Sequence, residues 1–261
     1  MKLLLKPLQI LYCLYAYLVF IVLMIAIFPF VIAASFFGRI RGGNAIYRLC
    51  MFWGDCWFLL TGIWHRNIYE GDRLKNEQFI YVANHISYID APVIVKTLRR
   101  SIRALGKHEM AKVPVFGYIY KYAVVLVDRT NAEERAKSVR QLKSVLRKNI
   151  SIFIFPEGTF NLTHQPLKSF YDGAFRIAIE TQTPIRPVLF LDAYDRMHYR
   201  SLFSLTPGRS RSLFLPPIPV EGYTMQDVAK LKQQVYEIME EKLVEYGASW
   251  IKEEVNESLG H

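Results

Sequence analysis

Residues 78–100 read QFIYVANHISYIDAPVIVKTLRR: an apolar run, a short polar turn, and then a stretch with helical spacing. The apolar run through Asn84 is typical of a β-strand. The stretch from Tyr88 onward spaces its apolar residues as a helix does. A strand that leads directly into a helix is the repeating unit of α/β folds.

The same alternation continues along the chain from residue 65. Strand-like runs cover residues 78–84, 101–106, 123–127, 151–155, 185–191 and 211–216. Helix-like stretches cover residues 88–100, 110–123, 131–148, 170–182 and 224–247. The pattern predicts an α/β fold: a single domain over residues 65–261, with a mostly parallel sheet flanked by helices. In such sheets ligands bind where strands end and helices begin, so those junctions are the places to search for a site.

The N-terminal region is different, because no charged residue lies between Lys6 and Arg39. As a helix these 32 residues would span about 48 Å, against about 30 Å for the hydrocarbon core of a bilayer. Two arrangements fit: a tilted crossing, or a bend at Pro29 and a return. A cleaved signal peptide is the rival, but its apolar segment is only about 7–15 residues long. We therefore expect a retained membrane anchor.

A second apolar piece, residues 46–64, is interrupted by Arg48 and Asp55. These charges favour an interfacial or re-entrant helix that closes a membrane-binding hairpin with the first one. Residues 1–64 are thus predicted to form the anchor. The three cysteines all lie there, at positions 13, 50 and 56, which indicates neither a disulfide framework nor a metal cluster.

Positive charge is concentrated in one part of the chain. The net charge is +10, and residues 96–129 hold eight Lys/Arg against two acidic residues. Beside a membrane anchor, a basic patch attracts anionic lipid headgroups, at about 1 kcal/mol per residue near the surface. Nucleic acid is the usual alternative, but the anchor favours lipid and argues against a nucleic-acid partner.

The first strand-to-helix junction carries His85 and Asp90, five residues apart. One interpretation is structural: Ser87-x-x-Asp90 is a capping-box pattern at a helix start. The other is catalytic, with the carboxylate holding one ring nitrogen so that the other can take a proton from a hydroxyl. Taken alone, the pair is common enough that the structural interpretation would be preferred.

Two further junctions carry polar residues. FPEGTF, residues 155–160, follows a buried strand, and its Glu157 either binds a ligand or forms a surface ion pair. Asp128 and Arg129 follow the run AVVLV. Arginine suits phosphate because its planar fork binds two oxygens at once, although a solvated arginine at a helix start is the plainer alternative.

Together these junctions resemble the motifs of the glycerophospholipid acyltransferase family, whose best-known members are lysophosphatidic acid acyltransferases. The matching segments are Asn84-His85-x4-Asp90, VVLVDR at 124–129, FPEGT at 155–159, Pro-Ile-x-Pro-Val at 184–188, and GKHEMAKVPVFG at 106–117. The resemblance covers roughly residues 60–246 with the motifs in the family's order. The first four of these segments are the family's motifs, and residues 106–117 lie between the first two of them. Four ordered motifs are far more specific than any one, and they favour the catalytic interpretation of His85.

The resemblance implies a membrane-bound O-acyltransferase that acylates a lysophospholipid. His85, oriented by Asp90, would deprotonate the acceptor hydroxyl, which attacks an acyl thioester directly. The resemblance implies that Arg129, Glu157, Gly158 and Thr159 position the acceptor headgroup and that Lys107 assists electrostatically. The sequence has no Gly-x-Ser-x-Gly elbow and no cysteine near these motifs, in agreement with a mechanism that forms no acyl-enzyme.

The resemblance also implies the partners and the location. The acyl donor would be acyl-CoA or acyl carrier protein, with no tightly bound cofactor and no metal. The partners would be a lyso-lipid acceptor, anionic membrane lipids and, if it is the donor, acyl carrier protein. The catalytic domain would lie on the cytoplasmic side of a membrane, the inner membrane in a bacterium, where acyl thioesters are supplied.

Two segments depart from the family pattern. Phe160 and Asn161 stand where an arginine and a serine are usual, and Tyr171 stands where a lysine is common. Lys168 and Arg176 are the nearest other cations in this segment. Lysophosphatidic acid therefore stays the favoured acceptor beside two alternatives: a lyso-lipid without a phosphate monoester, and a lipid-binding protein without turnover. A metal hydrolase using His85, Asp90, His108 and Glu109 lacks the usual ligand spacing.

Overall fold

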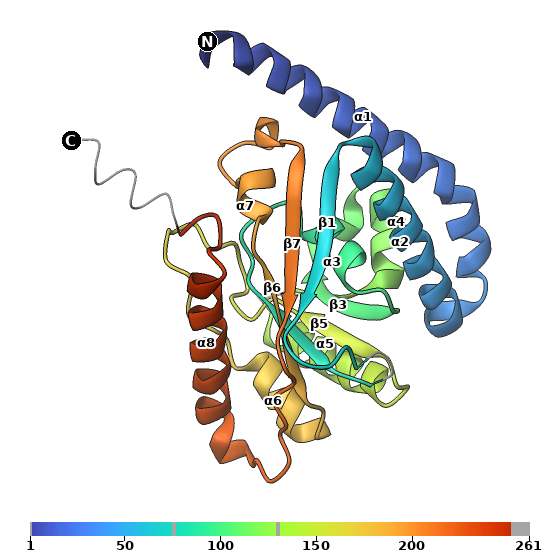
Figure 1. Cartoon of the computed structure of the whole chain (residues 1–261). Helices are drawn as coiled ribbons and strands as arrows, with labels where there is room; N and C mark the ends of the chain where they lie inside the picture. Colours follow the sequence, from blue (N-terminus) through green and yellow to red (C-terminus); the bar gives the residue numbers. More distant parts are fainter. Residues whose placement is uncertain (1, 75–76, 129–130, 252–261) are drawn as a thin grey trace.

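The computed structural model describes residues 2–74, 77–128 and 131–251. Within this part of the chain seven strands form one sheet in the order β1-β7-β6-β2-β5-β3-β4 (Figure 1). The strands are β1 (Ile63–Tyr69), β2 (Ile80–Ala83), β3 (Ile102–Lys107), β4 (Val124–Val127), β5 (Ser151–Ile154), β6 (Ile185–Phe190) and β7 (Gly208–Phe214).

Strand direction divides the sheet into two parts. β6, β2, β5, β3 and β4 all run parallel to one another. β7 runs antiparallel to β6 and pairs in parallel with β1, so these two strands run the other way. Every residue of β2, β5 and β6 is buried, as expected for strands covered on both faces. The predicted α/β domain with a mostly parallel sheet is confirmed.

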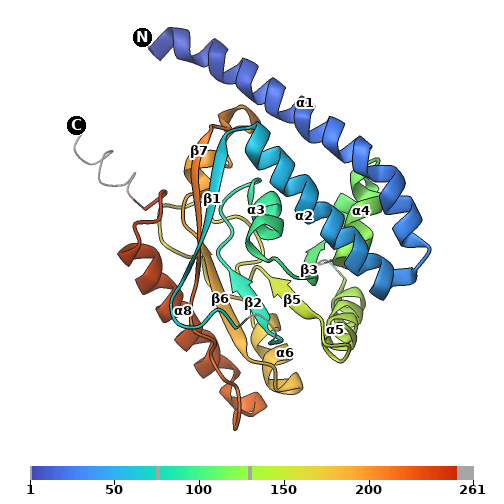
Figure 2. The ribbon, with the colours of Figure 1, turned by 45° about the vertical axis from the view of Figure 1, so that its right-hand side comes forward.

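Helices cover both faces of the sheet. α3 (Asp90–Thr97) and α4 (Phe116–Ala123) contact α2 (Gly43–Leu60) on one face. On the other face, α6 (Gly173–Thr181) lies between α5 (Ala132–Leu146) and α8 (Val228–Glu245), as Figure 2 shows. α7 (Ala193–Arg196) is a single turn after β6, and short 3₁₀ turns cover His108–Lys112, Leu202–Ser204 and Met225–Asp227.

The N-terminal region forms a helical hairpin on the face of the sheet that carries α3 and α4. α1 (Lys2–Ser35) runs as one helix through Pro29, and a π-helical turn at Gly38–Gly42 leads back into α2 (Figure 1). Trp57 Nε1 donates to the carbonyl of Ala16 at 2.9 Å, and the ring of Phe20 meets that of Trp53 edge-on at 4.6 Å. The stretch Lys6–Ser35 is long and apolar enough to cross a membrane by length and composition.

Only one stripe of α1 is used in this packing. Its buried residues are Cys13, Ala16, Ile27, Val31 and Ala34. A second stripe stays exposed, with Leu11, Leu14, Leu18, Val22 and Ile25. α1 therefore packs against α2, which connects it to the domain. Its other side presents a continuous apolar face to the outside.

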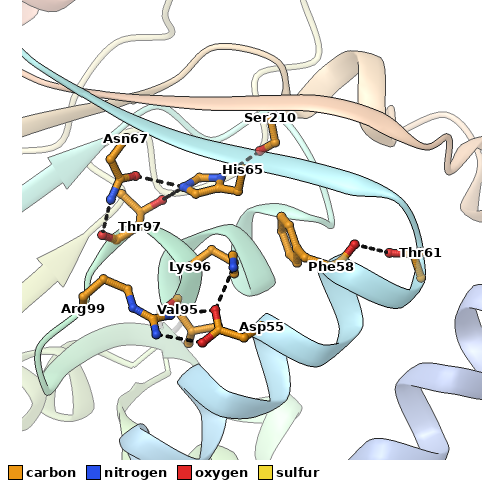
Figure 3. A network of polar contacts seen from close by, with 10 residues as sticks. All are labelled: Asp55, Phe58, Thr61, His65, Asn67, Val95, Lys96, Thr97, Arg99 and Ser210. Carbon is orange, nitrogen blue, oxygen red and sulfur yellow. Dashed lines mark hydrogen bonds and ion pairs between the residues drawn. The ribbon is translucent and has the colours of Figure 1, made fainter.

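Strand β1 was not anticipated, and the predicted boundary between residues 64 and 65 falls inside it. Its sequence, IWHRNIY, has three consecutive polar residues at its centre and so does not form an apolar run. His65 explains how polar residues are tolerated there: its ring contacts Ser210 Oγ at 3.1 Å and Asn67 Oδ1 at 2.9 Å (Figure 3). Asn67 in turn donates to the carbonyl of Thr97 at 2.9 Å, which joins β1 to the end of α3.

Several cations of the basic stretch at residues 96–129 are engaged inside the protein. Lys96 and Arg99 both bind Asp55 of α2, at 2.7 and 2.8 Å (Figure 3). Arg103 is only 4% exposed and donates to the carbonyl of Arg39, at the turn of the hairpin. A side chain at Gly43 would collide with its guanidinium. These three cations attach the hairpin to the domain, so the stretch offers less free charge to lipid than its composition suggests.

Candidate active site

The parallel strands bring the sequence motifs to one edge of the sheet. β2, β5, β3 and β4 are neighbours and point the same way, so their carboxyl ends lie together. His85 follows β2, and Glu157 follows the adjacent β5. Lys107 ends β3 and pairs with Val127, directly before the Asp-Arg motif. The first three motifs thus meet along one edge, as expected for ligand sites in such sheets.

His85 and Asp90 form a hydrogen-bonded pair. Asp90 Oδ2 lies 2.8 Å from His85 Nδ1 and also accepts the backbone N–H groups of Ile86 and Ser87, each at 2.9 Å. The carboxylate is fully buried, and it makes no side-chain cap at the start of α3. Its bond to the Ser87 N–H is the half of a capping box in which the carboxylate reaches back three residues, and the same oxygen also contacts the His85 ring. Asp90 holds the preceding turn and the imidazole ring in one arrangement.

The imidazole ring lies between two aromatic side chains. It stacks on Phe155 at a centroid distance of 3.8 Å, and Phe160 meets it at 4.4 Å. Because Asp90 Oδ2 accepts both backbone N–H groups and faces Nδ1, the fitting neutral tautomer has its proton on Nδ1 and a lone pair on Nε2. The side chain is 22% exposed, and within the described residues Nε2 has no hydrogen-bond partner. This arrangement suits a general base with an accessible nitrogen.

Glu157 is buried at the site, and its carboxylate accepts hydrogen bonds from two backbone N–H groups. It is 1% exposed; Oε1 accepts the N–H of His85 at 2.8 Å and Oε2 that of Lys168 at 3.0 Å. Burial raises the pKa of Glu157 to about 7, against the backbone hydrogen bonds, which lower it. Its observed contacts position the backbone on both sides of the site, and direct contact with an acceptor stays a prediction.

The other predicted residues lie around this centre at different depths. Gly158, with φ of 74°, makes the tight turn after β5 that a residue with a side chain adopts rarely. Thr159 is exposed, and its hydroxyl accepts a hydrogen bond from Lys168 Nζ at 2.8 Å. Lys107 is 63% exposed and lies 3.4 Å from Glu109. Arg129 lies outside the described residues, so its role in headgroup binding also stays a prediction.

Two asparagines near the base have structural roles that the motif alone did not reveal. Asn84 donates from Nδ2 to the carbonyl of Phe190 at 3.1 Å and accepts its N–H at 2.8 Å, which ties β2 to β6. The N–H of Asn161 donates to the carbonyl of His85 at 2.7 Å. The sequence signal available for these two roles was position, because Asn84 precedes His85 and Asn161 follows Phe160.

In the ranges described, no three His, Cys, Asp or Glu residues lie close enough together to hold a metal ion.

Sequence comparisons place this arrangement among known proteins. The acyltransferase family profile matches residues 65–191. A 1-acyl-sn-glycerol-3-phosphate acyltransferase of Salmonella typhimurium is 31% identical over 171 residues, covering 64% of this chain and 67% of that protein. An uncharacterised acyltransferase of Schizosaccharomyces pombe is 30% identical over 177 residues, covering 66% and 62%. A 1-acyl-sn-glycerol-3-phosphate acyltransferase of Cocos nucifera is 27% identical over 178 residues, covering 67% and 57%.

The match thus spans less than two thirds of the yeast and coconut proteins. Among solved structures, the 1-acyl-sn-glycerophosphate acyltransferase of Thermotoga maritima superposes with a TM-score of 0.74 at 24% identity. The superposition covers 96% of this chain and 99% of the other, so the fold, including the N-terminal hairpin, is shared. From the family match and the identity to the Salmonella protein, we conclude that this chain belongs to the acyltransferase family.

Proposed function

We propose that the protein is a membrane-bound O-acyltransferase that transfers a fatty acyl chain from an acyl thioester to 1-acylglycerol-3-phosphate, giving phosphatidic acid. The single observation that carries this is the contact of 2.8 Å between His85 and the buried Asp90. It leaves Nε2 free to accept a proton at a partly exposed site. The names of the Salmonella and coconut relatives support the acceptor.

The reaction follows from these two side chains. Nε2 of His85 takes the proton of the acceptor hydroxyl while its oxygen attacks the thioester carbonyl. Asp90 stabilises the resulting imidazolium through Nδ1–H. The tetrahedral intermediate then expels the thiol, which leaves with the proton from His85. The N–H groups of Ile86 and Ser87 are already bound to Asp90, so the oxyanion needs other donors.

A second acceptor class is supported by Phe160. Its ring lies 4.4 Å from that of His85 and 4.9 Å from that of Tyr88, so an apolar wall stands where the family usually has a cation. Such a wall suits an acceptor without a phosphate monoester, such as a lyso-aminolipid. The third possibility, lipid binding without turnover, does not account for an oriented base with an accessible nitrogen.

Membrane attachment rests on the hairpin. The exposed apolar stripe of α1 continues at the turn with Phe36 and Phe37, beside Arg39 and Arg41. Aromatic and basic residues at one end of an apolar helix favour the boundary between headgroups and acyl chains. We propose that the hairpin holds the catalytic domain at the cytoplasmic face of a membrane.

Lipid headgroups and the acyl donor are the proposed partners. Lys112 and Lys121 remain as cations for anionic headgroups, because Lys96, Arg99 and Arg103 are engaged internally and Lys107 is paired with Glu109. Binding to anionic vesicles should therefore be weaker than the charge count suggests and should fall with salt. The donor is acyl-CoA or acyl carrier protein, and no tightly bound cofactor takes part in the steps above.

A direct assay tests the function. The full-length protein in detergent is incubated with a labelled acyl donor, either acyl-CoA or acylated acyl carrier protein. Each reaction also contains one acceptor: lysophosphatidic acid, lysophosphatidylethanolamine, a lyso-aminolipid or 1-acylglycerol. We expect labelled phosphatidic acid from lysophosphatidic acid. A product only from an acceptor without a phosphate monoester would establish the second acceptor class. No product from any combination would leave the lipid-binding alternative.

A further inference from the structure

Lys168 is placed beside the base by a buried carboxylate. Oε2 of Glu157 accepts the backbone N–H of Lys168, and Oε1 of the same group accepts that of His85. The carboxylate of Glu157 therefore bridges the backbone N–H groups of His85 and Lys168. Because Glu157 is 1% exposed, this connection is shielded from water and holds the segment around Lys168 against the catalytic turn.

The side chain of Lys168 contacts the turn that carries Glu157 and Thr159. Its Nζ donates to Thr159 Oγ1 at 2.8 Å. Among the described residues no carboxylate forms an ion pair with it, whereas Lys107 is paired with Glu109 and Lys232 with Asp172. An ammonium group has three donors, and one is used by Thr159. Lys168 thus presents an ammonium group with free donors at Thr159, on the turn that Glu157 ties to the backbone of His85.

The charge of Lys168 matters because Phe160 occupies the position where the family usually has an arginine. Phe160 contacts the ring of His85 and supplies no charge. Arg176, the other nearby cation, lies elsewhere: it lines a groove of about 300 Å³ between α5 and α6, with Ala136 and Arg140. Of these two cations, Lys168 alone contacts the turn that carries Glu157 and Thr159.

We propose that Lys168 Nζ and the hydroxyl of Thr159 bind the phosphate of the acyl acceptor, which makes Lys168 a residue that determines acceptor specificity. The proposal rests on the function proposed above. An ammonium and a hydroxyl at one point supply charge-assisted hydrogen bonds to a phosphate monoester. Phe160 then packs against the base and the acceptor's apolar part. Phosphate groups also occur in acyl-CoA, so the test must separate the two sources.

The experiment compares Lys168→Met and Lys168→Arg with Arg176→Met, which makes the same change of charge in the α5–α6 groove. Each full-length variant is assayed with lysophosphatidic acid and with 1-acylglycerol. The donors are acyl-CoA and a phosphate-free acyl thioester of N-acetylcysteamine. Thermal unfolding of each variant reports whether it is folded.

We expect Lys168→Met to lower kcat/KM for lysophosphatidic acid by about 10- to 150-fold, mainly through KM, because one hydrogen bond to a charged group is lost. The loss should persist with the phosphate-free donor and be less than about 3-fold for 1-acylglycerol. Lys168→Arg should restore most of the activity, and Arg176→Met should match the unmodified protein.

Three results would overturn the inference. Equal loss on both acceptors would show that Lys168 only supports the turn through Thr159. A loss confined to acyl-CoA would assign the phosphate to the donor. Unchanged kcat/KM for a folded Lys168→Met variant would remove Lys168 from the site. Failure of the proposed function is seen separately, because the unmodified protein would then make no phosphatidic acid.

Discussion

His85 and His65 both lie among polar side chains, but their surroundings differ in charge and in access. At His85, one ring nitrogen faces the buried carboxylate of Asp90, and the other has no hydrogen-bond partner in the part of the chain that the structure describes. At His65, both nitrogens contact neutral groups, among them Ser210 and Asn67 (Figure 3). Burial lowers the pKa of His65 to about 4, and the nearby charges of Lys96 and Arg99 also lower it.

The contrast shows what separates a base from a structural histidine. A base needs a carboxylate that stabilises the imidazolium and a free nitrogen that reaches substrate. His85 has both, whereas His65 has no paired carboxylate and stays neutral to hold β1 against α3. Changes at the two sites should therefore act on different quantities: turnover at His85 and the stability of the fold at His65.

The largest effect is expected for His85→Ala. Removing the base should lower kcat by about 10³–10⁴-fold, with little change in thermal unfolding because the ring is partly exposed. Steady-state rates with lysophosphatidic acid and acyl-CoA measure the first quantity, and differential scanning fluorimetry the second. Turnover close to that of the unmodified protein would rule out the mechanism.

Asp90→Asn should be nearly as damaging. An amide oxygen in the place of Oδ2 can still accept the two backbone N–H groups and Nδ1–H, but it is neutral and does not stabilise the positive charge of the imidazolium, so kcat should fall by about 10²–10³-fold. KM should change little, since Asp90 is buried away from substrate. The kcat and KM values of the purified variant check this; a pure KM effect would contradict the orienting role.

Glu157→Gln should have an intermediate effect. The side-chain amide can accept only one of the two backbone N–H groups and turns a donor toward the other, at about 1–3 kcal/mol of unfolding free energy. The shifted backbone of His85 should lower kcat by roughly 10–100-fold on every acceptor. Chemical denaturation and parallel assays with two acceptors measure both. A loss restricted to one acceptor would instead indicate direct substrate contact.

His65→Gln should leave kcat within about 2-fold and change only how stability depends on pH. The pKa of His65 falls from 6.5 in the unfolded chain to about 4 in the fold. Between these values the unfolded state binds more protons, so His65 makes stability rise with pH, by roughly 3 kcal/mol at most. Glutamine preserves a hydrogen bond but does not titrate, so this rise should vanish.

Glu157 should oppose His65 in the same pH range. Its pKa rises from 4.5 to about 7 on folding, so the folded state binds more protons and stability falls as pH increases. The two contributions nearly cancel between pH 4.5 and 6.5. Unfolding free energies from pH 4.5 to 6.5 should therefore fall with pH in His65→Gln and rise in Glu157→Gln. Identical slopes in the two variants would contradict these assignments.

Much of the fold was predictable because its signals are local. The six predicted strands all form, and each predicted helix corresponds to a helix in the structure. β1 was missed because it is an edge strand whose polar residues are satisfied only by partners such as Ser210 and Thr97. The motif residues were recognised from their order and spacing, and the pairing of His85 with Asp90 was predicted, but the backbone contacts of Asp90 and Glu157 were not.

The sequence by itself determined the alternation of strands and helices, the apolar N-terminal helix, and the residue types available for acyl transfer. These depend on neighbours in the chain, through periodicity and turn chemistry. Only the tertiary structure decided that Glu157 binds two backbone N–H groups, that Lys168 lies one carboxylate from the base, and that Asp55 engages Lys96 and Arg99. Such contacts depend on which strands become neighbours in the sheet, and residues far apart in the chain meet only after the sheet has formed.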